Sequence, residues 1–244
     1  LGAELSAPVG RGQGEAPLIP VSPVSVTGSA TVELAGEQPV VISGHDSVIV
    51  AGGSLRHGDT ARPSLEVMRL DRASKQWTNL PPVPKGFYVH NGAFVGGEPL
   101  LVASPCPDRA DVYRWNEQCL GDQVLMLDPG QTAWEAHQVP RSDKLSSLST
   151  DTAGATGTST LAMIPQSIGG VGAVLFDAKT KQFTTVAPPG PGGAAVPAAY
   201  CVTGGGVFID AGAHPQGGTP SSGGSVWILD GNKWRGPAAV PAAQ

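Results

Sequence analysis

The stretch LEVMRLD at residues 65–71, with Trp77 and the run LPPVP at residues 80–84 after it, sets the pattern that decides the fold. An apolar run ends at Asp71, a short polar stretch follows, and an aromatic side chain comes six residues after the aspartate. Apolar runs bounded by turn residues favour strands, and an aspartate side chain can bond the backbone of a tight turn. The prolines then remove backbone donors, so the sheet ends there.

The same pattern occurs three more times along the chain. It is seen in QVLMLD (residues 123–128) before Trp134, in GAVLFD (residues 172–177) before Phe183, and in SVWILD (residues 225–230) before Trp234. The four anchoring aspartates lie 57, 49 and 53 residues apart. Self-similarity at this period indicates a repeat architecture in which each repeat forms one four-stranded unit.

Two further strands are expected before each aspartate, joined by short turns in which glycine supplies a positive φ. The candidates are residues 39–43 and 47–51, 88–95 and 99–103, 158–164, and 198–202 and 207–209. In the third repeat the partner of residues 158–164 is not evident from the sequence. The Ser- and Thr-rich residues 141–157 are expected to be a mobile insertion.

These segments resemble kelch repeats, the blades of galactose-oxidase-like and other kelch β-propellers. The resemblance is carried by VAGG at residues 50–53 and by residues 70–81, and it covers about residues 39–241. It implies an all-β, kelch-like β-propeller with about four recognisable blades. Kelch propellers usually carry about six or seven blades. Four repeats therefore imply a small propeller, further blades that the pattern does not reveal, or a part of a larger ring.

Two regions are expected along the chain. Residues 1–38 form an N-terminal arm, within which residues 24–34 have the composition of a strand. We expect this strand to close the ring by completing a blade made by the other end of the chain, or to belong to a preceding blade. Residues 39–244 hold the propeller repeats.

Composition narrows the classes of partner. The net charge is −5, and no basic run could neutralise successive phosphates, so nucleic acid is not an expected partner. No apolar stretch reaches the 18 or so residues of a transmembrane helix, and the first residue is Leu1, which suggests processing or excision from a longer chain.

Charged residues make up 14% of the chain, against roughly 25% in ordinary soluble domains. This favours an extracytoplasmic location: secreted, periplasmic or at the cell surface.

The chain has three cysteines. Cys106 and Cys119 lie close together in a segment rich in polar and turn-forming residues, which predicts a disulfide that closes a loop. The alternative is a pair of free thiols in a cytosolic protein. Cys201, in an apolar stretch, is expected to be reduced and buried.

The galactose-oxidase resemblance invites a search for a copper site, but the tyrosines and histidines of this chain do not reproduce its spacing. The sequence also has no zinc-ligand spacing, nucleophile elbow or phosphate loop, and we expect neither a metal nor a cofactor. His90, between Tyr88 and Asn91 at the start of a predicted inner strand, is the best candidate to line the central channel. A hydrogen-bonded structural histidine is the alternative.

The most varied chemistry lies in residues 104–121, which contain Arg109, Tyr113, Arg114 and Trp115. Tyr, Trp and Arg dominate binding hot spots, and a loop between two strands of a blade would project from one face of a propeller. Trp115 could instead pack the loop onto its own blade. We therefore expect a non-enzymatic interaction or scaffold module that binds a protein or a glycan through projecting loops. Either this chain forms the ring alone or another chain completes it. The alternative is a kelch-propeller enzyme that acts on a carbohydrate at the channel mouth.

Overall fold

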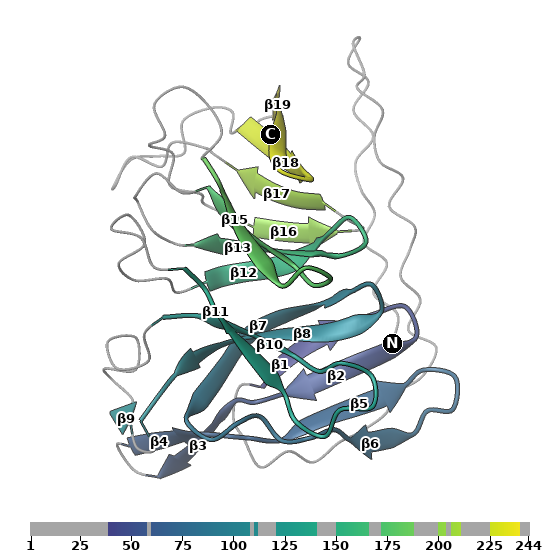
Figure 1. The fold of residues 1–244 in the computed structure, drawn as a ribbon, viewed down its shortest axis with the longest axis vertical. Coiled ribbons are helices and arrows are strands. Elements are labelled where there is room, and N and C mark those ends of the chain that lie inside the picture. The colour runs from purple at the N-terminus through teal and green to yellow at the C-terminus, as the bar shows by residue number, and fades with distance from the viewer. Residues whose placement is uncertain are drawn as a thin grey trace, which may run out of the picture. The chain divides into compact units, whose positions relative to one another are not determined.

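The chain is described from a computed structural model. The described residues are 39–57, 60–107, 110–111, 121–140, 150–165, 172–187, 200–203, 206–210 and 225–239. All of them belong to one compact unit, Val32–Gln244. Their regular elements are all strands, which confirms the prediction of an all-β fold (Figure 1). The strand expected within residues 24–34 lies outside the described residues.

Sixteen of the strands form four antiparallel sheets of four strands each (Figure 1). The first sheet contains β1 (Val40–Ser43), β2 (Ser47–Ala51), β5 (Val67–Asp71) and β6 (Trp77–Asn79). The second contains β7 (Phe87–Val95), β8 (Glu98–Pro105), β10 (Gln123–Met126) and β11 (Glu135–Gln138). The third contains β12 (Thr150–Thr156), β13 (Thr160–Pro165), β14 (Ala173–Asp177) and β15 (Gln182–Val186). The fourth contains β16 (Tyr200–Thr203), β17 (Gly206–Asp210), β18 (Ser225–Asp230) and β19 (Lys233–Ala239).

In each of these four sheets the strands pair in the order in which they follow along the chain, so each sheet is a meander. A smaller sheet of three strands was not expected from the sequence. It consists of β3 (Ser54–His57), β4 (Thr60–Pro63) and β9 (Ala110–Asp111), which are inserted between strands of the first and second sheets.

The third sheet corrects one expectation. Residues 141–157 were expected to be a mobile insertion, but residues 150–156 form β12, whose Ala153 pairs with Met163 of β13. The strand lacks the large apolar side chains that mark strands in a sequence. Its small residues suit its position, because β12 lies beside both β7 and β16.

Two of the four repeated aspartates, Asp71 and Asp177, cap turns, as the sequence predicts. The Asp71 carboxylate accepts hydrogen bonds from the Ser74 backbone N–H at 2.7 Å and the Ser74 hydroxyl at 2.8 Å. The Asp177 carboxylate accepts them from the backbone N–H groups of Thr180 at 2.8 Å and Lys179 at 2.9 Å. These hydrogen bonds stabilise the charged form and hold the pKa of both carboxyls below the usual value, led by the Ser74 N–H and the Thr180 N–H.

Neighbouring sheets pack face to face through three hydrophobic clusters. The cluster between the first and second sheets includes Ile42, Ile49, Val67, Val89, Leu101, Leu125 and Trp134. The cluster between the second and third sheets includes Leu100, Val102, Val124, Leu161, Val174 and Phe176. The cluster between the third and fourth sheets includes Ala162, Ile164, Ala173, Leu175 and Leu229. The leading strands follow the same order, with β7 beside β1, β12 beside β7 and β16 beside β12.

Close packing between the first and second sheets depends on Gly52. Its φ is +66°, a conformation that side chains rarely adopt, and an added Cβ would lie 2.7 Å from the Cβ of Val89. This glycine belongs to the VAGG segment and lets β7 approach the end of β2.

Two tryptophans also link neighbouring sheets by hydrogen bonds. The Trp134 indole N–H donates to the Pro81 carbonyl at 2.7 Å, and the Trp234 indole N–H donates to the Ala187 carbonyl at 2.7 Å. Pro81 and Ala187 are equivalent positions, ten residues after Asp71 and Asp177 respectively. A tryptophan of one sheet thus holds the chain where it leaves the preceding sheet.

Three of the four repeated aromatic residues hold equivalent positions in the strand register. Trp77 pairs with Leu70, Phe183 with Phe176 and Trp234 with Leu229, each one residue before the repeated aspartate. In the second sheet Glu135 pairs with Met126, which places Trp134 opposite Leu127. In the third sheet Phe183 replaces the tryptophan and packs on Phe176 with ring centroids 4.8 Å apart, without an N–H to donate.

Candidate functional site

Of the residues that the sequence singles out for binding, the structure describes His90. Arg109, Tyr113, Arg114, Trp115 and Cys119 lie outside the described residues. The candidate site is therefore built from His90 and the groups that the fold brings to it.

His90 lies at an irregularity in the pairing of β7 with β8. Val89 pairs with Ala103 and Asn91 pairs with Val102, so His90 is an extra residue in β7. Such a bulge bends the strand and redirects a side chain, and bulges are common beside functional sites. Here the bulge directs the His90 ring toward the residues that begin and end the segment between β8 and β10.

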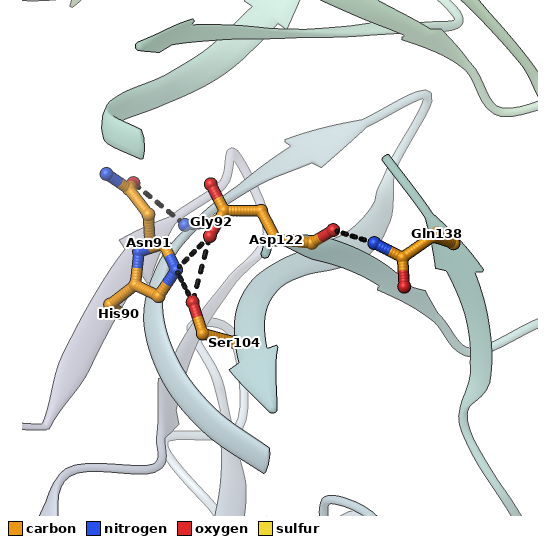
Figure 2. A network of polar contacts seen from close by, with 6 residues as sticks. All are labelled: His90, Asn91, Gly92, Ser104, Asp122 and Gln138. Atoms are coloured by element: carbon orange, nitrogen blue, oxygen red, sulfur yellow. Dashed lines mark hydrogen bonds and ion pairs between the residues drawn. The ribbon is translucent and has the colours of Figure 1, made fainter. Parts of the chain in front are cut away.

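His90, Ser104 and Asp122 form a compact polar cluster, which we call the Asp122 network (Figure 2). The His90 Nε2 lies 3.1 Å from the Asp122 Oδ1 and 3.2 Å from the Ser104 Oγ. The Ser104 hydroxyl donates to the same Asp122 Oδ1 at 2.9 Å. The Asp122 side chain is fully buried, and that of His90 is 16% exposed. A buried carboxylate needs such partners to offset its lost hydration.

The geometry of the Asp122 network differs from that of a catalytic relay. In a Ser-His-Asp triad the serine and the carboxylate bind opposite nitrogens of the imidazole ring. Here Ser104 and Asp122 both meet Nε2 and also bind each other. Glycoside hydrolysis commonly uses two carboxyls, and among the described residues this network contains one, that of Asp122. The hydrogen bonds of this network hold Ser104 near the end of β8 and Asp122 before the start of β10 close to each other.

The backbone of Asp122 is held as firmly as its side chain. Its carbonyl accepts a hydrogen bond from the Gln138 side-chain amide at 3.2 Å (Figure 2). It accepts a second one from the Val139 N–H at 3.1 Å. Gln138 is itself oriented by Gln123, whose amide donates to its Oε1 at 2.9 Å. These bonds fix Asp122 at the entry to β10.

The Asp122 network joins the two ends of the segment that carries the predicted binding residues. Ser104 is the last but one residue of β8 and Asp122 lies directly before β10, so their hydrogen bond closes the base of residues 106–121. The Cys106 N–H donates to the Gly86 carbonyl at 2.7 Å, which fixes the first end again. The start and finish of this segment are thus fixed close together.

Tyr88 lies next to this base. Its ring stacks against the His90 ring, with centroids 6.3 Å apart and planes inclined by 29°. Burial raises the pKa of the Tyr88 hydroxyl, because it disfavours the charged phenolate. The hydroxyl therefore stays protonated at neutral pH.

Sequence reasoning identified His90 and missed Ser104, Asp122 and Gln138. The sequence contains one local signal for Asp122, because Gly121 and Asp122 directly precede an apolar strand. A polar residue at the entry of a buried strand must find a partner, so this position could have been marked as a site of internal hydrogen bonding.

Cys106 is 8% exposed, and its sulfur is disulfide-bonded. The side chains of Cys119 and Cys201 lie outside the described part of the structure, so the pairing of Cys106 with Cys119 stays a prediction. We expect iodoacetamide to label one of the three cysteines in the denatured, unreduced protein and all three after reduction. The loop is short, and the bond should add up to about 3 kcal/mol of stability. Peptide mapping that joined Cys106 to Cys201 would contradict the prediction.

No protein-family model matches this chain, and a search of curated proteins found no match. Among the described residues, no group of three or more His, Cys, Asp or Glu side chains is placed to hold a metal ion. The described part of the chain also contains no helix long and apolar enough to cross a membrane.

Proposed function

We propose that the four sheets are successive blades of a kelch-like β-propeller or of a part of one. Three observations support this: the meander order within each sheet, the row of leading strands, and the repeated bond from a tryptophan to the preceding sheet. Neighbouring propeller blades share these features because each blade buries its faces against the next.

On this framework we propose a non-enzymatic interaction or scaffold module, located outside the cytoplasm, that binds a protein or a glycan through residues 106–121. The observation that carries the proposal is the hydrogen bond from Ser104 to Asp122, which closes the base of this segment. A fixed base lowers the conformational entropy lost on binding. The segment carries Tyr113, Arg114 and Trp115, residue types that provide much of the affinity in protein interfaces.

The Asp122 network favours this role over carbohydrate chemistry. Its single carboxylate is fully buried and bonded to both His90 and Ser104, so it is not placed to reach a substrate. A general acid or base must lie within hydrogen-bond reach of the group that it protonates or deprotonates.

The experiment begins with a glycan array and an array of extracellular protein domains, both probed with the wild-type chain. For each ligand found, Trp115→Ala is expected to weaken binding by about 2 kcal/mol, roughly 30-fold, because it removes a central aromatic contact. The melting temperature should hardly change. Binding is measured by biolayer interferometry, and unfolding by circular dichroism.

Arg114→Ala tests a second residue of this segment. Arg72→Ala, which removes an arginine side chain elsewhere, is its matched control. Arg72 is exposed in the turn between β5 and β6, where it donates to the Ser43 hydroxyl at 2.6 Å. Only the Arg114 change should weaken binding. Equal affinity in wild type, Trp115→Ala and Arg114→Ala would refute a binding role for residues 106–121.

A further inference from the structure

The sheet of β3, β4 and β9 joins two equivalent connections of successive repeats. Strands β3 and β4 form a hairpin between β2 and β5, the second and third strands of the first sheet. β9 lies between β8 and β10, the second and third strands of the second sheet, and within residues 106–121. β4 pairs with β9, and the three strands lie together in Figure 1. A hairpin of the first repeat therefore reaches the segment proposed for binding.

The hairpin leaves the first sheet from a fixed base. The Gly52 N–H donates to the Glu66 carbonyl at 2.9 Å, and the Ser64 N–H donates to the Gly53 carbonyl at 2.9 Å. Ser64 is 1% exposed. Both glycines have a positive φ, so the VAGG segment forms the backbone turn from which the hairpin starts. These bonds anchor β4 to the first sheet without involving β9.

The strand register shows which backbone groups of β4 face β9. The bond from Ser64 to Gly53 marks a hydrogen-bonded pair, and such pairs alternate along an antiparallel ladder. Arg62, two residues before Ser64, therefore also directs its N–H and C=O toward β3. Its neighbour Ala61 directs these groups to the opposite side of β4, where it pairs with Ala110 of β9. The backbone of Ala61 is thus the link between the two repeats.

This link acts at a different place from the Asp122 network. The bond from Ser104 to Asp122 joins the two ends of residues 106–121. Bonds at the ends of a loop do not by themselves order the residues between those ends. Ala110 and Asp111 lie between them, and their pairing with β4 sets their position. A partner then loses less conformational entropy when it binds.

We propose that Ala61 is a positioning residue for binding through residues 106–121, and that it acts through the pairing of its backbone with β9. The first repeat would then hold in place the surface that the second repeat presents. This inference rests on the binding role proposed above. Ala61 acts without touching the partner, by raising the fraction of molecules in which β9 is in place. The apparent affinity for a partner scales with that fraction.

Proline substitution removes a single backbone donor and tests this link. Ala61→Pro removes the N–H that faces β9 and leaves the donors that join β4 to β3. Amide hydrogen exchange within residues 106–121 should become at least about 10-fold faster, because the segment opens more easily. The dissociation constant for a ligand found on the arrays should rise about 10-fold. Exchange is measured by mass spectrometry of peptic fragments, and binding by biolayer interferometry.

The matched control makes the same change in the other strand of the hairpin. Arg56 lies in β3, at the edge of the three-stranded sheet, and its pair with Ala61 alternates with the hydrogen-bonded pairs. Its N–H therefore faces away from β4. Arg56→Pro should exchange and bind like Arg56→Ala, which loses the same side chain and keeps the N–H. The amides of β8 and β10 should stay protected in every variant, which separates a local loss from general destabilisation.

A second variant breaks the link from the side of β9. Ala110→Pro removes the N–H that faces Ala61 and should reproduce both effects, so the test stands if Ala61→Pro does not fold. Unchanged exchange in the proline variants overturns the proposal, whether or not a ligand is found. Faster exchange with unchanged affinity also overturns it.

Trp115→Ala separates this proposal from the binding role on which it rests. If Trp115→Ala weakens binding and Ala61→Pro does not, the positioning role alone fails. If neither change weakens binding, the binding role of residues 106–121 fails with it.

Discussion

Replacing Trp134 with alanine is expected to lower the free energy of unfolding by about 3–5 kcal/mol. Trp134 is 6% exposed and lies in the cluster between the first and second sheets, beside Leu125 and Leu101. Its removal leaves a cavity and deprives the Pro81 carbonyl of its donor. Urea unfolding followed by circular dichroism measures the change.

Two phenylalanine variants separate the hydrogen bond from the packing. Trp134→Phe keeps an aromatic ring but removes the N–H that binds Pro81, and should cost about 1–2 kcal/mol more than the loss of ring area alone. Trp77→Phe removes an N–H that has no acceptor among the described residues and should lack that extra cost. Equal costs at the two positions would contradict a role for the bond to Pro81.

The sequence predicted the all-β fold, and most of the strands that precede each aspartate, because its strongest signals are local. An apolar run, an aspartate turn and an aromatic residue follow one another within about a dozen residues, and the register confirms that Trp77, Phe183 and Trp234 hold the same position. Residues 150–156 were missed because their small side chains lack apolar alternation. The sheet of β3, β4 and β9 was missed because β9 is two residues long and pairs with a distant strand.

The candidate site was harder to predict than the fold. His90 could be proposed from its neighbours Tyr88 and Asn91, but its partners come from other strands. The bulge after Val89 and the register of β7 with β8 decide that His90 meets Ser104 and Asp122. No local pattern encodes a one-residue shift in pairing, because the shift depends on how two strands fit together.

The Asp122 network connects the stability of the second sheet with the proposed function. Asp122 binds residues of β7 and β8 through its carboxylate, and residues at the end of β11 through its carbonyl. It is thus the residue at which the strands of this sheet and the base of residues 106–121 are joined. A change there should affect folding and binding together, whereas a change at Trp115 should affect binding alone.

Replacing Asp122 with alanine is accordingly expected to lower the free energy of unfolding by about 3 kcal/mol, because Ser104 and His90 lose their shared partner in a buried site. Asp122→Asn keeps an oxygen that can accept one of these bonds and should cost less. Asp46→Ala removes a carboxylate that is 84% exposed and should change stability by less than about 0.5 kcal/mol. Urea unfolding gives the three values, and limited proteolysis with mass mapping should show faster cleavage within residues 106–121 in Asp122→Ala. If Asp122→Ala is as stable as Asp46→Ala and is cleaved no faster than wild type, the carboxylate does not hold the base of this segment.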